Sequence, residues 1–380
     1  MTDWHVPLAD LVITDDDLAT VVDVYRSGWL SMGPRTEELE AAFAAFTGVR
    51  HAIAVANGTA ALHLACQAVG LGPGDEVVVP SLTFVATANA VAYTGAKPVF
   101  ADIAGLTEPW LSRQACEEVL SDRTRAIMVV DYGGHSGELE ALQALCAERG
   151  LVLLEDAAHA AGSRLNGRHL GAFGLAGAFS LFSNKNFAIG EGGLVVTDDD
   201  AVADRVRLLR SHGMTSLTWD RHRGHASDYD VVGLGFNYRM DEPRAALAAS
   251  RLRRLDADNS RRAELDARYR QALDGLELAP ALPPVPGLES AHHLFVAVLD
   301  EGVDRDGFRR HLAGEGIQTS VHYPPLHQTT LYRDSGARLP VTEEYAARAV
   351  TLPLFAHLTE ADQDRVVAAA RAALASGVRV

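Results

Sequence analysis

Short apolar runs alternate with amphipathic stretches through the first half of the chain. A continuous apolar run such as Leu151-Val-Leu-Leu154 is typical of a strand buried on both faces of a parallel sheet. Stretches such as residues 112–120 and 138–149 lie between these runs and predict amphipathic helices. The alternation predicts an α/β fold with a mostly parallel central sheet. We place its strands at residues 77–80, 98–101, 125–130, 151–154 and 178–182.

The second half of the chain predicts a smaller unit. Residues 213–235 are rich in glycine and polar side chains without clear periodicity, which fits a long loop that arches toward a neighbouring subunit. We expect a large domain over residues 1–245 and a smaller C-terminal α/β domain over residues 246–380. The remaining strands are expected at residues 192–198 and 294–299, and the helices at 201–212, 243–273, 305–315 and 360–375.

The composition is that of a soluble globular enzyme. Of the 380 residues, 48% are hydrophobic and 22% are charged, which are ordinary proportions for such a protein. The net charge of −16 argues against a general affinity for nucleic acid or for an anionic membrane. An acidic substrate therefore needs local arginines, for which Arg221, Arg223 and Arg239 are candidates. A solvated mobile loop is the alternative for the first two.

The cysteines and the start of the chain predict a cytoplasmic protein without a metal. Cys66, Cys116 and Cys146 are odd in number and have no C-x-x-C spacing, which favours a reducing compartment. His222 and His225 lack a consistent set of nearby carboxylate or cysteine ligands. The first residues form no basic leader, and no apolar run reaches transmembrane length.

Lys185 follows a predicted strand and precedes the closely spaced glycines of Gly190-Glu-Gly-Gly193. Partial desolvation at such a position lowers the pKa of a lysine and leaves a free amine that can condense with a carbonyl. A solvated loop lysine is the ordinary alternative. Two further segments favour the reactive lysine.

Polar side chains follow the apolar run at residues 151–154, at the strand end where open α/β sheets bind ligands. They belong to Glu155, Asp156 and His159. A carboxylate at Asp156 can keep a pyridine nitrogen protonated, which makes the ring an electron sink. The alternative role for Asp156 is a helix N-cap.

A predicted helix begins at Asn57-Gly58-Thr59. Its free backbone amides and positive dipole end suit a phosphate, and Gly58 lets the phosphate come close to the backbone. The same residues also form an ordinary helix cap. Neither the P-loop nor the dinucleotide fingerprint is present, so we expect a single phosphate. Amine, carboxylate and phosphate turn together predict a pyridoxal phosphate site.

The chain resembles the DegT/DnrJ/EryC1/StrS family of nucleotide-sugar aminotransferases, within the fold-type I (aspartate aminotransferase-like) enzymes. The resemblance covers nearly the whole chain and implies a homodimer with shared active sites. It is carried by Gly28-Trp-Leu-Ser-Met-Gly33, Pro80-Ser-Leu-Thr-Phe-Val-Ala-Thr87, Glu155-Asp-Ala-Ala-His159, Ser183-Asn-Lys-Asn186, Gly190-Glu-Gly-Gly193, Gly235-Phe-Asn-Tyr-Arg-Met240 and His322-Tyr-Pro-Pro325.

The resemblance implies a role for each residue of the site. Lys185 would join the cofactor aldehyde, Asp156 would pair with the pyridine nitrogen, and His159 would bond the phenolic oxygen of the ring. Phe84 would stack on the ring face, although it could instead be a core residue. The phosphate would be held by Gly58, Thr59 and Ser180, and by Asn237 of the partner subunit.

Substrate contacts are implied for Arg239, Tyr323 and His327. Several of the implied site residues also have a structural alternative. Ser180 could be a satisfied interior hydroxyl, Asn237 a turn residue, and Arg239 an exposed cation. His327 could simply be a surface histidine.

The resemblance also implies the reaction, in which an amino donor, expected to be L-glutamate, supplies nitrogen to a keto-sugar nucleotide. Glu191 favours amination at C4 of dTDP-4-keto-6-deoxyglucose, because C3-specific relatives more often carry aspartate there. The alternatives are a C3-aminating enzyme, a sugar dehydratase with histidine in place of Lys185, and a non-catalytic member lacking Lys185 or Asp156. Asp131-Tyr-Gly-Gly-His135 departs from the more common His-Leu-Tyr-Gly-Gln, which either alters the substrate pocket or is neutral.

Overall fold

A computed structural model describes residues 4–216 and 228–379. Its largest element is a seven-stranded sheet with the strand order β1-β9-β8-β5-β4-β2-β3. All neighbouring strands run parallel except at β9, which is antiparallel to both β1 and β8. The predicted α/β fold with a mostly parallel sheet is therefore confirmed. The strands are β1 (His51–Val55), β2 (Glu76–Pro80), β3 (Lys97–Ala101), β4 (Thr124–Val130), β5 (Val152–Asp156), β8 (Ala176–Ser180) and β9 (Gly193–Thr197).

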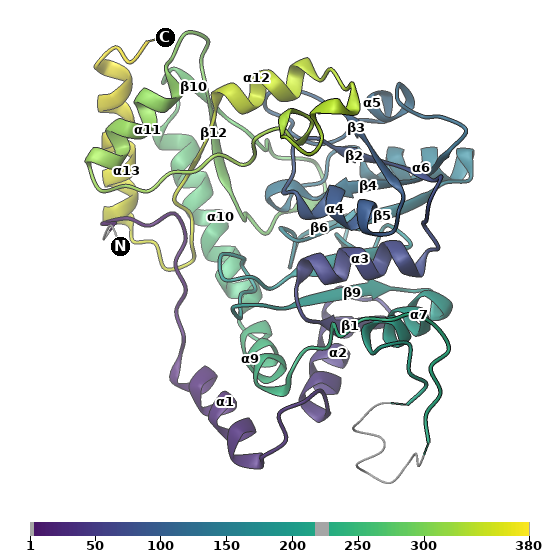
Figure 1. The fold of residues 1–380 in the computed structure, drawn as a ribbon. Helices are drawn as coiled ribbons and strands as arrows, with labels where there is room; N and C mark the ends of the chain where they lie inside the picture. Colours follow the sequence, from purple (N-terminus) through teal and green to yellow (C-terminus); the bar gives the residue numbers. More distant parts are fainter. Residues whose placement is uncertain (1–3, 217–227, 380) are drawn as a thin grey trace.

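Helices cover both faces of this sheet because successive strand residues point to opposite sides. Val78 and Ile127 belong to the core under one group of helices, whereas Val77 and Val79 belong to the core under the other. The first group is α2 (Pro34–Thr47), α6 (Leu139–Arg149) and α9 (Glu242–Leu252). The second is α3 (Gly58–Ala68), α4 (Ala86–Tyr93) and α7 (Asp200–Arg210). Figure 1 shows the resulting three layers.

The C-terminal part forms its own antiparallel sheet and core. Its sheet has the order β10-β12-β13 and lies to one side of the large sheet in Figure 1. Phe308 and Val366 are buried in this core, which also contains Val6 from the start of the chain. Its elements are β10 (Leu278–Pro280), β12 (Phe295–Leu299), α11 (Arg305–Gly314), α12 (Pro340–Arg348), β13 (Ala349–Leu352) and α13 (Glu360–Ala375).

Most of the remaining elements are short. A small sheet joins β11 (Leu288–Glu289), β6 (Arg164–Leu165) and β7 (Arg168–His169). Three-residue 3-10 helices lie at Tyr132–Gly134, Leu326–Gln328 and Arg333–Ser335. The other helices are α1 (Asp15–Ser27) and α5 (Arg113–Glu117).

The single helix predicted over residues 243–273 is wrong. The structure has α9 and then α10 (Leu255–Ala272), separated at Arg253 and Arg254. Arg254 donates to the buried carboxylate of Asp17 on α1, at 2.7 Å. A residue at the break between the two helices thus forms an ion pair with the N-terminal helix. The predicted boundary between the large and the small domain, between residues 245 and 246, falls within α9. This division into domains stays a prediction.

Several strands differ from the sequence-based expectation. In the large sheet, β1 was not predicted, and β8 ends at Ser180 rather than at residue 182. Outside that sheet, β10, β13 and the short strands β6, β7 and β11 were not predicted. The predicted loop at 213–235 is described only in part; there, Met214 pairs with Val231 in an isolated bridge.

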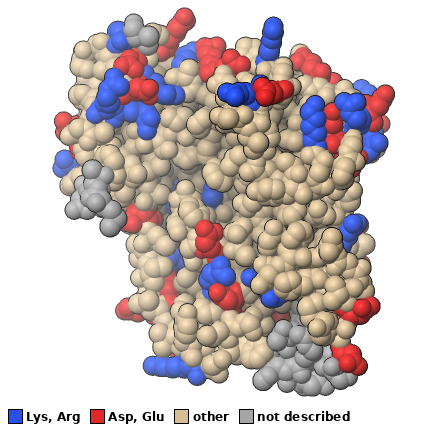
Figure 2. All heavy atoms as spheres, viewed as in Figure 1, with Lys and Arg blue, Asp and Glu red and all other residues tan. Residues whose placement is uncertain are grey.

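Charged side chains are spread over the surface in mixed groups. On the face shown in Figure 2, Lys and Arg lie beside Asp and Glu, with broad areas between them that carry neither. The negative net charge of the chain is therefore not gathered into one patch on this face. Among the described residues, no helix is both long enough and apolar enough to cross a membrane.

Candidate active site

A cavity of about 480 Å³ opens at the carboxyl ends of β4, β5 and β8. This is where parallel α/β sheets bind ligands, and the volume is typical of a small-molecule site. The wall combines polar and apolar side chains from segments far apart in the sequence. It is lined by Asn57, Gly58, Thr59, Leu62, Thr83, Phe84, Ala86, Val130, Asp156, Ala158, His159, Ser180, Phe182, Asn184, Lys185, Glu191, His322 and Tyr323.

Lys185 lies in the loop that follows β8. The loop folds back on itself, because the amide of Lys185 donates to Phe182 and that of Ile189 donates to Leu181, both at 2.9 Å. Burial lowers the pKa of Lys185 to about 8, and the negative charge of Asp156 opposes this shift. A substantial fraction of the amine is therefore neutral near physiological pH, as a nucleophilic lysine requires.

Asp156 is the last residue of β5 and is 5% exposed. Its Oδ2 accepts a hydrogen bond from the hydroxyl of Thr87 at 2.6 Å, and its Oδ1 accepts one from the amide of Ala158 at 3.2 Å. Turns rather than a helix follow β5, so Asp156 does not cap a helix. Its carboxylate is available to a ligand in the cavity.

Thr87 and Thr83 are site residues to which the sequence analysis assigned no role. Thr83 lies 2.8 Å from Thr87 between the two hydroxyl oxygens, and it lines the cavity. The sequence does contain one signal for these two residues. They are four positions apart, on either side of Phe84 at the start of a helix, and this spacing places both hydroxyls on one turn.

His159 is held at both ring nitrogens. The amide of Gly133 donates to Nδ1 at 3.2 Å, and the hydroxyl of Tyr323 lies 3.1 Å from Nε2. Because Nδ1 accepts, the proton of the neutral ring lies on Nε2. Burial, followed by the positive charge of Lys185, lowers the pKa of His159 well below its usual value. His159 is therefore a neutral ring with an Nε2 donor.

The start of α3 forms a close-fitting anion cradle. Asn57 caps the helix by accepting from the amide of Ala60 at 2.8 Å. The amides of Gly58 and Thr59 donate no hydrogen bond to any residue in the described ranges. A Cβ on Gly58 would lie 2.7 Å from Cβ of Ser180, so only glycine fits this wall. Free amides at a helix N-terminus suit a phosphate.

Phe84 and Ser180 both face the cavity. Phe84 is 57% exposed and its ring centre lies 6.1 Å from that of Tyr323. Phe84 is therefore not a core residue, and its ring is free to stack on a ligand. Ser180 is partly exposed at the end of β8, directly opposite Gly58.

Three predicted site residues lie away from this cavity. His327 is 5% exposed, and its ring nitrogens lie 2.7 Å from the Ser81 hydroxyl and 3.0 Å from the Glu343 carboxylate. Its side chain is thus used inside the protein, and the placement does not support a substrate contact. Asn237 and Arg239 pair with Ser211 and Val55 in isolated bridges, and neither lines the cavity of its own chain.

Other candidates fall outside the described residues, namely Arg221, His222, Arg223 and His225. The three cysteines are free thiols and are buried. Within residues 4–216 and 228–379, no group of three or more His, Cys, Asp and Glu is placed to hold a metal ion.

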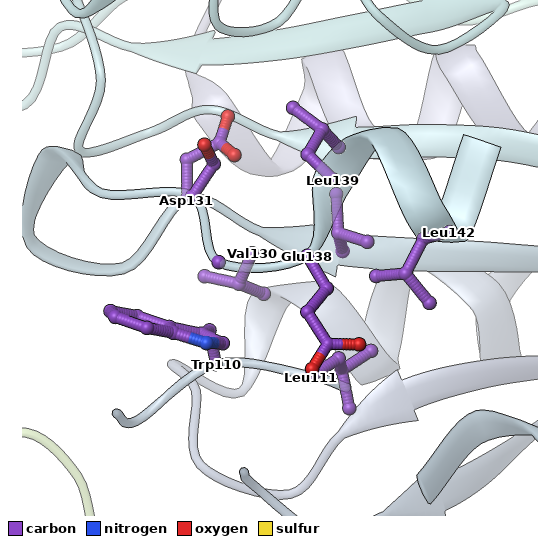
Figure 3. Close-up of a pocket in the computed structure, with 10 residues that line it drawn as sticks. Trp110, Leu111, Val130, Asp131, Glu138, Leu139 and Leu142 are labelled. Carbon is purple, nitrogen blue, oxygen red and sulfur yellow. The ribbon is translucent and has the colours of Figure 1, made fainter. Parts of the chain in front are cut away.

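Asp131, from the segment that departs from the common motif, borders a second and much smaller cavity of about 10 Å³ (Figure 3). It is 1% exposed, and neither carboxyl oxygen has a hydrogen-bond partner among the described residues. Burial, followed by the charges of Glu155 and Asp156, raises the pKa of Asp131 well above its usual value. Its side chain does not line the larger cavity.

The residues around the large cavity fit pyridoxal phosphate. An amine with a lowered pKa, a carboxylate, an exposed aromatic ring and a helix start with free amides line one space. These groups match the aldehyde, the ring nitrogen, the ring face and the phosphate of that cofactor.

Comparison with known proteins leads to the same cofactor. The chain matches the model of the DegT/DnrJ/EryC1/StrS aminotransferase family over residues 12–371. It is 35% identical to the aminotransferase TlmJ from Streptoalloteichus hindustanus, with 99% of each chain covered and a TM-score of 0.90. The S. venezuelae DesV structure, in complex with a ketimine intermediate, is 37% identical over 94% of each chain, with a TM-score of 0.87. The sugar aminotransferase CalS13 from Micromonospora echinospora is 29% identical over 97% of this chain and 100% of that chain, with a TM-score of 0.88.

Proposed function

Because this chain belongs to the DegT/DnrJ/EryC1/StrS aminotransferase family and is thus a pyridoxal phosphate-dependent sugar aminotransferase, we propose that it aminates a dTDP-keto-6-deoxy sugar. The resemblance to this family and the predicted cofactor are confirmed. The proposed substrate is dTDP-4-keto-6-deoxyglucose, the aminated position is C4, and the donor is L-glutamate. The observation that carries the proposal is that Lys185 and Asp156 line the same cavity.

Bound pyridoxal phosphate supplies an aldehyde that joins an amine and a ring that withdraws electrons from the adjacent carbon. We assign Lys185 to the aldehyde, Asp156 to the ring nitrogen and Phe84 to the ring face. The amides at the start of α3 and the hydroxyls of Thr59 and Ser180 would hold the phosphate. All of these residues border the one cavity.

Lys185 also moves the proton. Its Nζ, when neutral, would take the proton from the donor carbon that carries the nitrogen and pass it to the former aldehyde carbon of the cofactor; in the reverse half-reaction it would move a proton from that carbon to the sugar carbon that receives the nitrogen. The lowered pKa of about 8 makes this proton transfer efficient near neutral pH.

His159 would donate from Nε2 to the phenolic oxygen of the ring. The amide of Gly133 fixes the tautomer that allows this. Tyr323, which contacts the same nitrogen at 3.1 Å, is a proposed substrate contact at the edge of the site.

Glu191 supports amination at C4. It lines the cavity and occupies the position at which C3-specific relatives more often carry aspartate. C3 amination is the alternative within the same reaction class. The presence of Lys185 disfavours a dehydratase, and the joint presence of Lys185 and Asp156 disfavours a non-catalytic role.

We further propose a cytoplasmic homodimer with shared active sites. Val231, Val232 and Leu234 are 55%, 59% and 95% exposed, on the segment that leads to Asn237. Burial of such apolar side chains against a second copy is favourable, and Asn237 would then reach the partner's phosphate. We propose that the guanidinium of Arg239, whose main chain pairs with Val55, binds the diphosphate of the nucleotide.

The test is direct. Purified protein is loaded with pyridoxal phosphate, supplied with glutamate, and given a panel of dTDP-3-keto and dTDP-4-keto sugars, with mass spectrometry and NMR of the products. We expect amination of the 4-keto sugar and loss of turnover by about 10²-fold or more in Lys185→Ala. Amination only of the 3-keto sugar would overturn the C4 assignment, and unchanged turnover in Lys185→Ala would overturn the site.

A further inference from the structure

Two threonine hydroxyls form a chain of hydrogen bonds that ends at the carboxyl of Asp156. Oγ1 of Thr87 is 2.6 Å from Oδ2 of Asp156, and Oγ1 of Thr83 is 2.8 Å from Oγ1 of Thr87. Thr83 and Thr87 are 2% and 0% exposed. Because buried polar groups find their partners inside the protein, these contacts form the standing environment of the carboxyl.

The number of available protons fixes the direction of both hydrogen bonds. An ionised Asp156 only accepts, so Thr87 donates its single hydroxyl proton to Oδ2. Thr87 then accepts in the 2.8 Å contact, and Thr83 is the donor. With the amide of Ala158 donating to Oδ1, each oxygen of the ionised carboxylate has a donor.

One turn of the chain positions these groups together with the aromatic wall of the site. The amide of Thr87 donates to the carbonyl of Phe84 at 3.2 Å, just as α4 begins at Ala86. Thr83 and Phe84 both line the cavity. The side chain that would stack on the ring and the hydroxyls that contact Asp156 therefore belong to one turn of the chain.

Burial works against the ionised form of Asp156. It raises the pKa of this carboxyl; the hydrogen bond from Thr87 is the largest opposing effect, ahead of the amide of Ala158 and the charge of Lys185. Hydrogen bonds to a charged acceptor are about twice as strong as neutral ones. Removing the hydroxyl would leave the carboxylate buried with a donor on one oxygen only.

We propose that Thr87, held in place by Thr83, is a positioning residue that keeps Asp156 ionised and aimed at the ring nitrogen of the cofactor. The inference rests on the proposed role of Asp156. It assigns to the segment at 83–87 a function at the nitrogen end of the ring, in addition to the stacking of Phe84.

The experiment compares Thr87→Val, which keeps the shape and removes the hydroxyl, with Thr87→Ser, which keeps the hydroxyl. Thr94→Val is the matched control, because Thr94 caps the end of the same helix and its hydroxyl contacts only local backbone, donating to the carbonyl of Val91 and accepting from the amide of Ala96. The dissociation constant of pyridoxal phosphate is measured from visible absorbance between about pH 4, the ordinary range of a carboxyl, and about pH 9, above the pKa of about 8 for Lys185.

In Thr87→Val we expect the acid limb of the binding profile to move up by about one pH unit, a tenfold change in the ratio of ionised to neutral carboxyl. Thr87→Ser should restore the profile, Thr94→Val should leave it unchanged, and Thr83→Val should shift it in the same direction by less. With a cofactor analogue that has carbon in place of the ring nitrogen, the profiles of Thr87→Val and the parent protein should coincide.

A Thr87→Val profile that superimposes on the parent profile overturns the proposal, as does an equal shift in Thr94→Val. A shift that persists with the analogue also overturns it, because the effect would then not involve the ring nitrogen. If Thr87→Val does not fold, Thr83→Val with the analogue control decides in the same way. Failure of the parent protein to bind the cofactor would instead contradict the proposed site as a whole.

Discussion

The hydroxyl of Tyr323 lies 3.1 Å from Nε2 of His159, on the opposite side of the ring from the amide of Gly133 that donates to Nδ1. Tyr323 lies between α11 and α12 in the chain, whereas His159 follows β5. The contact therefore joins the C-terminal part of the protein to the large sheet at the edge of the cavity. It also gives Nε2 of His159 a partner that a ligand can replace.

We predict that Tyr323→Phe lowers kcat/KM for the keto sugar by about 2–12-fold, the value of one ordinary hydrogen bond. The dissociation constant of pyridoxal phosphate should stay the same, because the ring of His159 remains held by Gly133. Steady-state kinetics and a cofactor titration check both parts. A weakened cofactor affinity with unchanged kcat/KM would contradict the assignment of Tyr323 to the substrate.

The pKa of about 8 for Lys185 predicts how the cofactor-free protein takes up pyridoxal phosphate. Below this pKa the amine is protonated and cannot attack the aldehyde, so the association rate should rise as pH increases through about 8. In Asp156→Asn the midpoint should move to lower pH, since the charge of Asp156 raises the pKa of Lys185. Stopped-flow absorbance measures the profile; an unshifted midpoint would show that Asp156 does not act on Lys185.

Gly58→Ala should weaken pyridoxal phosphate binding by about tenfold or more, comparable with the loss of one charge-assisted hydrogen bond. The added Cβ would lie 2.7 Å from Cβ of Ser180 and would push apart the two walls of the proposed phosphate site. Gly72→Ala is the matched control, because a Cβ there meets nothing within 4 Å. Equal affinities for the two variants, measured by equilibrium dialysis, would contradict the phosphate assignment.

Asp131→Asn should stabilise the protein at neutral pH. The folded-state pKa of Asp131 is raised, mainly by burial, so the folded chain binds more protons than the unfolded chain above about pH 4 and loses stability as pH rises. The amide does not titrate, so the gain should be absent near pH 4 and grow with pH. We expect Tm to rise by about 2–4 °C at pH 7, as measured by calorimetry; a gain that does not depend on pH would contradict the titration of Asp131.

The sequence predicted most of what is built from long apolar runs. Continuous runs such as residues 151–154 produced buried parallel strands, and the polar residues after them, including Asp156 and His159, reached the cavity. The strand direction could not be predicted in this way. Gly193–Thr197 has the same kind of apolar run but is antiparallel to both neighbours, because direction depends on the connection and not on the run.

Residues that act through a partner were harder to predict. For Thr87 the sequence offers only its spacing from Thr83 around Phe84, and its role follows from its contact with Asp156 across 69 residues of sequence. His327 shows the opposite case. A histidine in a proline-containing loop suggests an exposed side chain that can contact a substrate. Instead, both ring nitrogens of His327 form hydrogen bonds inside the protein, one with Ser81 and one with Glu343.

The N-terminal segment is bound to both parts of the molecule. Val6 pairs with Ile317 within the C-terminal core, while Asp17 on α1 is bound by Arg254 between α9 and α10. Between these two points, Leu8 contacts Gln318 and Leu354, and the carbonyl of Val12 accepts from Arg251 and Arg254. The N-terminal segment is therefore a second covalent connection between the C-terminal core and the large sheet, so the relative placement of the two cores does not depend on α10 alone.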